Sequence, residues 1–326
     1  MIITRTPLRI SLGGGGTDLP SYYEQRGHGH LVAAAISKYV YVSVNRNFTN
    51  DLFLKYSQYE RVETTSQVSH PILKECLNLL GIDRGIEINS MADVPSGTGL
   101  GSSGSFTVGV LKALAHFCHE PKTSYELAEL ACEIEITRLQ EPVGKQDQYI
   151  AAMGGVASIT FRADGKVDSR QLQMSPLIRT QLEDGLLLFY TGHQRSALEA
   201  LREERSLLAG SRNVRSNLDE MRELGYLTAQ NLEAGNLEGF GELLSKQWTL
   251  KYERQPSQVH DQIDEWIRTG CKSGAAGGKL VGAGGGGFLL FYAVNKTGLR
   301  AAMESLGLSE VPFHFDYEGS VILVSR

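Results

Sequence analysis

The stretch 93-DVPSGTGLGSSGSFTVGVLKA-113 joins a dense run of glycine and serine to an apolar tail with helical spacing. Residues 99–104 within it satisfy the pattern G-x-G-x-x-G. A dinucleotide-binding fingerprint of that form lies in a tight turn directly between a strand and a helix. Here residues 92–98, which include Pro95, separate the pattern from the preceding apolar segment, and two successive helices are predicted after it. This context argues against a nicotinamide-dependent oxidoreductase.

The same stretch has the properties of a phosphate-binding loop. Glycines let the backbone wrap around an anion, and the unpaired amides and dipole of a helix N-terminus favour negative charge. Ser102, Ser103 and Ser105 fall in the first turn of the predicted helix, where a hydroxyl could add a hydrogen bond or a Mg²⁺ ligand. The alternative is a purely structural glycine turn. Neither the Walker A pattern nor the H-R-D and D-F-G elements of protein kinases occur in the sequence, so we expect a phosphate loop of another kind.

Composition excludes several classes of protein. A chain of 326 residues with 41% hydrophobic content is more easily read as two domains than as one. The net charge is −5 with dispersed lysines and arginines, which predicts no nucleic-acid partner. No apolar run approaches the roughly 20 residues of a membrane span and no signal peptide is recognisable, so we expect a cytoplasmic protein without a membrane partner. The four scattered cysteines are expected to be free thiols, and the eight histidines show no zinc-binding spacing.

Strands and helices alternate along the chain without a steady βαβ repeat, which predicts an α+β fold. Glycine clusters interrupt this pattern at residues 13–16, 97–104 and 284–287. We expect strands at residues 2–6, 8–12, 39–48, 86–91, 186–192, 312–319 and 320–326, with two more flanking the third glycine cluster and a hairpin over 156–172 that turns at Asp164-Gly165. We expect helices at residues 71–81, 103–117, 124–139 with Ser124 as N-cap, and 298–306, and a long helical region ending near residue 270.

The opening stretch also resembles the second motif of the GHMP kinases, P-x-x-x-G-L-G-S-S. Their first motif resembles 6-TPLRISLGGGGTDLP-20, and their C-terminal glycine-rich motif resembles 279-KLVGAGGGGFLLF-291. The three motifs occur in the family order. Together with 141-EPVGKQDQY-149 and 189-FYTGHQRS-196, the first motif is most similar to that of the bacterial D-glycero-D-manno-heptose 7-phosphate 1-kinases. Kinases of fucose and galactose share much of it.

The resemblance implies a two-domain GHMP kinase fold with the active site in the cleft between an N-terminal domain, 1–172, and a C-terminal domain, 173–326. It places ATP at the second motif, on Pro95, Gly97, Gly99, Leu100, Gly101, Ser102, Ser103 and Gly104. Mg²⁺ is expected on Ser103 and a helix glutamate. Glu133 and Glu135 are both candidates; we favour Glu135 from its position relative to Asp147, and the alternative for either is a solvated helix face.

The resemblance also implies the reacting groups. Asp147 matches the carboxylate beside the attacking hydroxyl, with Arg9 as its cationic companion; the alternative for Asp147 is a helix N-cap. Substrate is expected at Asp18 and the adjacent Gly14, Gly15, Gly16 and Thr17, although Asp18 alone would read as a turn residue. The third cluster, with Gly284, Gly285 and Gly286, is expected to close over the site, its alternative being a tight strand-to-strand turn. His193 and Arg195 are candidate ligands of a substrate phosphate. For His193 a partly buried structural histidine is the alternative, and for Arg195 a surface role.

The resemblance therefore predicts an ATP-dependent sugar kinase acting on the anomeric hydroxyl of a heptose 7-phosphate, in the synthesis of activated heptose for surface polysaccharides. A kinase of an unphosphorylated sugar is the first alternative. A non-catalytic sensor that binds sugar and nucleotide is the second. The expected partners are the sugar phosphate and ATP, and the sequence leaves a homo-oligomer open.

Overall fold

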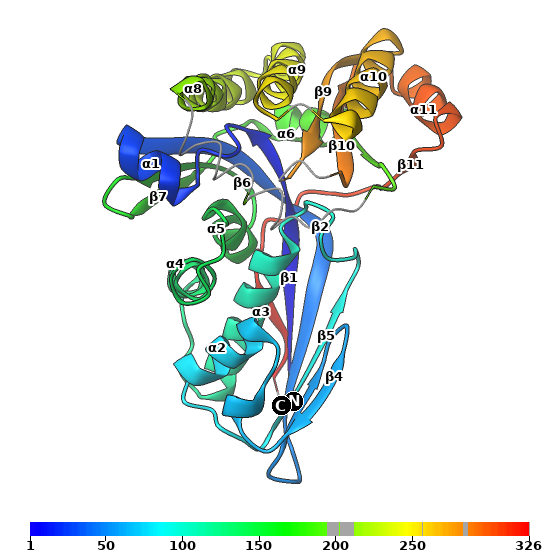
Figure 1. Cartoon of the computed structure of the whole chain (residues 1–326). Coiled ribbons are helices and arrows are strands. Elements are labelled where there is room, and N and C mark those ends of the chain that lie inside the picture. The colour runs from blue at the N-terminus through cyan, green and yellow to red at the C-terminus, as the bar shows by residue number, and fades with distance from the viewer. Residues whose placement is uncertain (194–201, 203–211, 256, 283–285, 326) are drawn as a thin grey trace.

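Two long antiparallel strands organise the protein (Figure 1). The computed structural model describes residues 1–193, 202, 212–255, 257–282 and 286–325. Strand β1 (Ile2–Gly13) pairs with β2 (His28–Arg46) from Ile2 opposite Val44 to Gly13 opposite Val32. The two strands expected at 2–6 and 8–12 are thus one strand, in which the pairing register shifts after Pro7. The strand expected at 39–48 begins eleven residues earlier, at His28.

Strand β2 serves two parts of the first sheet. Its C-terminal half pairs with β5 (Ile86–Ala92), which leads to β3 (Leu52–Lys55) and β4 (Tyr59–Val62). Its N-terminal half pairs with β6 (Val156–Arg162), the first strand of the predicted hairpin with β7 (Val167–Gln171). Strand β12 (Val321–Ser325) returns to pair with β1, so the two chain ends lie side by side (Figure 1). The domain division at residues 172 and 173 stays a prediction.

Helices cover one face of this sheet (Figure 1). They are α2 (Pro71–Leu79), α3 (Ser102–Phe117), α4 (Ser124–Cys132) and α5 (Gln146–Met153); α1 (Pro20–Arg26) follows the loop after β1. Ser124 is not the N-cap of α4: Thr123 is, because its hydroxyl accepts from the Glu126 amide in a capping box. The helix expected to reach residue 139 changes after Cys132 into a π-helix, η2 (Glu133–Arg138).

A second, antiparallel sheet has the order β11-β8-β10-β9. Its strands are β8 (Leu186–Tyr190), β9 (Ala275–Val281), β10 (Phe288–Ala293) and β11 (Ser309–Glu310). Around it lie α6 (Pro176–Gly185), α9 (Leu237–Arg254), α10 (Gln258–Lys272) and α11 (Lys296–Ser305). Helix α8 (Arg212–Ala234) packs between α9 and the first sheet. The strand expected at 312–319 is wrong: only Phe315 makes a β-bridge there, with Ile36.

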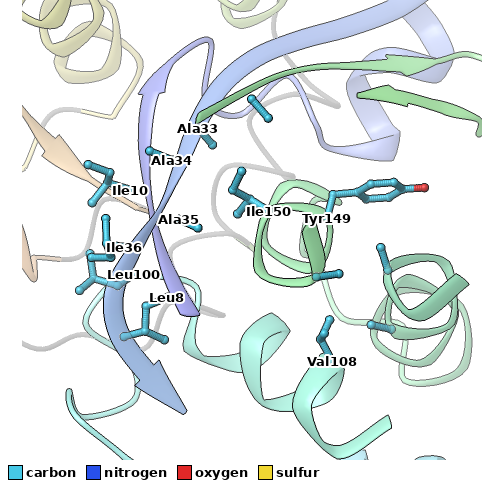
Figure 2. Packing of buried hydrophobic residues seen from close by; sticks show 14 of the residues in the cluster. Leu8, Ile10, Ala33, Ala34, Ala35, Ile36, Leu100, Val108, Tyr149 and Ile150 are labelled. Atoms are coloured by element: carbon cyan, nitrogen blue, oxygen red, sulfur yellow. The ribbon is translucent and has the colours of Figure 1, made fainter. Parts of the chain in front are cut away.

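A shared apolar core joins the two sheets. Figure 2 shows Leu8 and Ile10 on β1 beside Ala33–Ile36 on β2, with Val108 and Ile150 coming from the covering helices. The same cluster continues to Val281 and Phe288 in the second sheet. Because α8 packs on β2 as well, the apolar run 31–36 is buried on both of its faces. The mixed α+β architecture predicted from the sequence is confirmed.

Candidate active site

A cavity of about 950 Å³ brings the first two sequence motifs together with the C-terminal half. Its lining includes Arg9 from β1, the loop before α3, Asp147 from the first turn of α5, and residues of α9 and β9. Concave sites of this size suit small-molecule ligands.

Arg9 and Asp147 form an ion pair at the centre of the cavity. Arg9 Nε donates to Asp147 Oδ1 at 2.7 Å, with the Arg9 side chain 5% exposed and that of Asp147 25% exposed. Arg9 Nη1 donates to the carbonyl oxygen of Gly99 at 2.5 Å, and its backbone amide donates to that of Leu100 at 2.9 Å. The arginine therefore fixes both the carboxylate and the loop. Asp147 is the second residue of α5, and Lys145 occupies the N-cap position.

The loop before α3 is shaped by left-handed glycines. Three glycines have positive φ values, 78° at Gly97, 86° at Gly99 and 77° at Gly101. Residues other than glycine rarely adopt such values. A Cβ on Gly101 would lie 3.0 Å from Arg9 Cγ and 3.2 Å from Asp147 Cγ. Helix α3 starts at Ser102 with no side-chain cap, so its first amides are available to an anion. The Ser102 hydroxyl is buried and has no hydrogen-bond partner among the described residues.

Glu135 lies beside the start of α3. Ser103 Oγ donates to Glu135 Oε2 at 2.7 Å, and Gln148 Nε2 donates to Oε1 at 3.1 Å. Burial raises the Glu135 pKa to about 7, although these hydrogen bonds oppose the rise. Glu133 instead pairs with Arg138 and does not line the cavity. The two glutamates of one π-helix thus differ in environment, and Glu135 alone of the two meets Ser103.

Ser103 and Glu135 fit a small divalent cation. Both offer hard oxygen atoms, which Mg²⁺ prefers. In the part of the chain that the structure describes, no group of three or more His, Cys, Asp or Glu side chains could hold a metal ion.

Asp18 forms the other carboxylate of the site. Its carboxylate oxygens accept hydrogen bonds from the backbone amides of Gly16 and Gln146, each at 3.2 Å. Burial, followed by the nearby charge of Asp147, raises the Asp18 pKa from its ordinary value of 3.8 to about 6. A Cβ on Gly144 would lie 1.9 Å from Asp18 Oδ2, so only glycine fits there.

The first glycine cluster divides into two roles. Gly15 and Gly16 line the cavity with Asp18. Gly14 and Thr17 lie behind it: a Cβ on Gly14 would reach 2.2 Å from the carbonyl oxygen of His30, and the Thr17 hydroxyl donates to the carbonyl oxygens of Gly14 and His30. These two residues therefore shape the loop.

The third glycine cluster abuts the second at its described ends. A Cβ on Gly287 would lie 2.0 Å from the Thr98 carbonyl oxygen, and one on Gly282 would lie 2.4 Å from that of Gly99. Gly286 packs on His193 and does not line the cavity. Gly284, Gly285 and Arg195 lie outside the described residues.

His193 is not brought to the cavity. Its ring stacks on Trp266 at 5.8 Å between centroids, and Nε2 lies 3.1 Å from Gln262 Oε1. Stacking on Trp266 of α10 holds the ring in this position, which corresponds to the alternative of a partly buried structural histidine.

Two parts of the cavity were not predicted from the sequence. One is an apolar end with Tyr56, His70, Ile72, Met91 and Phe106. The other is a polar wall with Gln247, Trp248, Lys251, Arg254 and Lys279. For the second, the helical spacing 247, 248, 251 and 254 is a usable signal, because it puts four side chains on one face of a helix.

Several known proteins resemble this chain in sequence or fold. Residues 65–155 match the family model described as the GHMP kinases N terminal domain. The matched residues include the loop before α3 and Asp147. The chain also has the GHMP kinase fold. The crystal structure of a D-glycero-D-manno-heptose 1-phosphate kinase from Bacteroides thetaiotaomicron superimposes with a TM-score of 0.80, at 24% identity, with 100% of both chains covered.

Two curated relatives of this GHMP-fold protein are similarly distant. The D-glycero-alpha-D-manno-heptose 7-phosphate kinase of Campylobacter jejuni is 29% identical over 303 residues, with 89% of each chain covered. The L-fucokinase/L-fucose-1-P guanylyltransferase of Bacteroides fragilis is 29% identical over 339 residues, covering 89% of this chain and 34% of that longer protein.

Among the described residues, the helices are too short or too polar to cross a bilayer.

Proposed function

We propose that the chain is an ATP-dependent sugar kinase that phosphorylates the anomeric hydroxyl of D-glycero-D-manno-heptose 7-phosphate to give the 1,7-bisphosphate. The observation that carries the proposal is the Arg9–Asp147 pair, which lies between the glycine loop of α3 and the Asp18 loop in one cavity. The similarity to the Campylobacter jejuni heptose 7-phosphate kinase supports the substrate class.

The nucleotide is assigned to the loop before α3 and to the apolar end of the cavity. Glycine amides and the first turn of α3 would hold the phosphates. The His70 ring meets Tyr56 edge-on at 4.6 Å between centroids and Phe106 in a tilted contact at 5.3 Å, and the three rings offer aromatic surface to a planar base. Burial lowers the His70 pKa, which keeps this ring neutral beside a neutral base.

The proposed reaction uses Asp147 as proton acceptor. The sugar hydroxyl loses its proton to Asp147 as its oxygen bonds to the γ-phosphorus, while the bond from that phosphorus to the β-bridging oxygen breaks and ADP leaves with the electron pair. Arg9 orients Asp147 through the 2.7 Å contact. Asp18 would accept hydrogen bonds from other hydroxyls of the sugar and fix its orientation.

A divalent cation would be held by Ser103 and Glu135, and Mg²⁺ is the ion that this donor set fits best. When bound, it neutralises charge on the nucleotide phosphates. The remaining roles belong to the protein: the α3 loop positions the phosphates, and the Arg9–Asp147 pair positions the acceptor oxygen.

A panel of sugars tests the proposal. ADP release with Mg·ATP is measured for heptose 7-phosphate, the same heptose without phosphate, fucose and galactose. Turnover confined to the 7-phosphate is expected. Turnover on fucose or galactose alone would show that the substrate is an unphosphorylated sugar. Nucleotide binding without turnover on any sugar would support the sensor alternative instead.

A further inference from the structure

One wall of the cavity is cationic. Helix α9 contributes Lys251 and Arg254, and β9 contributes Lys279. The other lining residues from these two elements are Gln247, Trp248 and Leu280, so neither element adds a carboxylate to the lining that the structure describes. The acidic lining residues all come from the first half of the chain: Asp18, Asp93, Glu135, Glu141 and Asp147.

This wall adjoins the substrate loop. Gln247 Nε2 donates to the carbonyl oxygen of Leu12, immediately before the first glycine cluster, at 3.1 Å. A Cβ on Gly13 would meet the Thr228 side chain of α8. Arg254 Nη1 donates at 2.8 Å to Asn217 Oδ1 on the same helix α8. Lys279, which donates to Gln247, is therefore linked through one side chain to the segment that leads to Asp18.

Lys279 shows that the wall is organised around positive charge. Its buried Nζ donates to Gln247 Oε1 at 3.0 Å. Burial first, and then the charges of Lys251 and Arg9, lower the Lys279 pKa well below its ordinary value. Lys251 Nζ donates to the carbonyl oxygen of Gly282, against the phosphate loop.

We propose that Lys251, Arg254 and Lys279 bind the phosphate group that the sugar substrate already carries. The inference rests on the proposed function and names the part of the site that would select a sugar phosphate. Three cations match a phosphate monoester, whose charge near pH 7 is about −1.5 to −2. Lys251 and Arg254 are three residues apart on one helical face, about 4.5 Å along the axis, so two oxygens of one phosphate can meet both.

A different role for the wall is stabilisation of the phosphoryl group in transfer. That role would act on every acceptor sugar alike, whereas a subsite for the substrate phosphate acts only on sugars that bear one. The two roles therefore separate by comparing the same sugar with and without its phosphate.

The test uses Lys251→Met and Arg254→Gln, with Lys246→Met as the matched control. Lys246 is an exposed cation of the same helix outside this cavity. KM and kcat are measured for heptose 7-phosphate and for the phosphate-free heptose. Each site variant should raise KM for the 7-phosphate about 10- to 100-fold and change KM for the free sugar less than about threefold. Lys246→Met should leave both unchanged. Equal losses on both sugars, or none on the 7-phosphate, overturn the proposal.

Direct binding separates this inference from the kinase reaction. Calorimetric titration without ATP compares the two sugars on wild type and Lys251→Met, after thermal unfolding confirms that the variant is folded. Tighter binding of the 7-phosphate by wild type, lost in the variant, is expected. If no sugar is phosphorylated, the proposed function fails while this difference still decides the subsite. Equal affinity of wild type for both sugars overturns the subsite and leaves a kinase of unphosphorylated sugars.

Discussion

Arg9 Nε lies 2.7 Å from Asp147 Oδ1, joining two residues that are 138 positions apart in the chain. The same guanidinium reaches the carbonyl oxygen of Gly99, so a strand, a loop and a helix meet at one charged group. This meeting point locates the proposed chemistry, because it lies where the nucleotide loop and the Asp18 loop face the same cavity.

Replacing Asp147 with Asn should abolish most of the turnover while the protein stays folded. A general base contributes about 10²- to 10⁴-fold to such reactions, and an amide cannot accept the proton. The check is kcat by ADP release. Asp164→Asn, in the exposed hairpin turn after β6, is the control and should retain wild-type activity. A kcat for Asp147→Asn within about threefold of wild type would remove the base role.

Replacing Asp18 with Asn should stabilise the protein at alkaline pH and not at acid pH. The Asp18 pKa is raised to about 6, so the folded state binds its proton more tightly than the unfolded state does. The contribution of Asp18 to the free energy of unfolding therefore falls as pH rises from about 4 to 6. Above pH 6 the buried carboxylate stays ionised, and the loss of stability remains. Asn never ionises, and we expect a gain of about 1–3 kcal/mol at pH 8. Urea unfolding of wild type and Asp18→Asn at pH 4 and pH 8 measures this gain in stability. A gain of equal size at both pH values would contradict ionisation of the buried carboxyl group as its cause.

Replacing Gly101 with Ala should cost activity beyond its cost in stability. Gly101 and Gly81 both have positive φ, 77° and 65°, so Ala at either should destabilise by about 1–2 kcal/mol. Only at Gly101 would the new methyl group press on Arg9 and Asp147; nothing lies within 4 Å at Gly81. We expect similar melting temperatures and a selective loss of kcat in Gly101→Ala. Matching kinetics of the two variants would count against the packing argument.

Replacing Glu135 with Gln should raise the Mg²⁺ concentration needed for half-maximal rate about 10- to 100-fold. The control is Glu133→Gln. Glu133 lies on the same π-helix but pairs with Arg138, so this variant should need the same Mg²⁺ concentration as wild type. Rates at saturating ATP over a Mg²⁺ series provide the measurement. Equal responses of the two variants would show that charge alone, without the Ser103 contact, explains the effect.

Features set by local sequence were predictable. The glycine and serine run before α3, the Pro71 start of α2 and the Asp164-Gly165 turn each depend on neighbouring residues, and the structure contains all three. The C-terminal glycine cluster was expected near the nucleotide loop only because of a family resemblance. Its described ends do contact that loop, at Gly99 and Thr98.

Features set by tertiary contacts were not predictable. Residues 31–36 include three consecutive alanines, which favour strands weakly, and they form β2 only because sheet partners and α8 enclose them. Residues 312–319 alternate like a strand but pair through Phe315 alone. The basic residues of α9 belong to no recognised motif, and the fold alone brings Lys251 and Arg254 to the cavity.

The proposed reaction can be followed by ³¹P NMR in the complete mixture with Mg·ATP and heptose 7-phosphate. We expect ADP together with an equal amount of a new phosphate ester coupled to the anomeric proton, and neither product with Asp147→Asn. ADP accompanied only by inorganic phosphate, or a new ester at another carbon of the sugar, would contradict the proposed reaction.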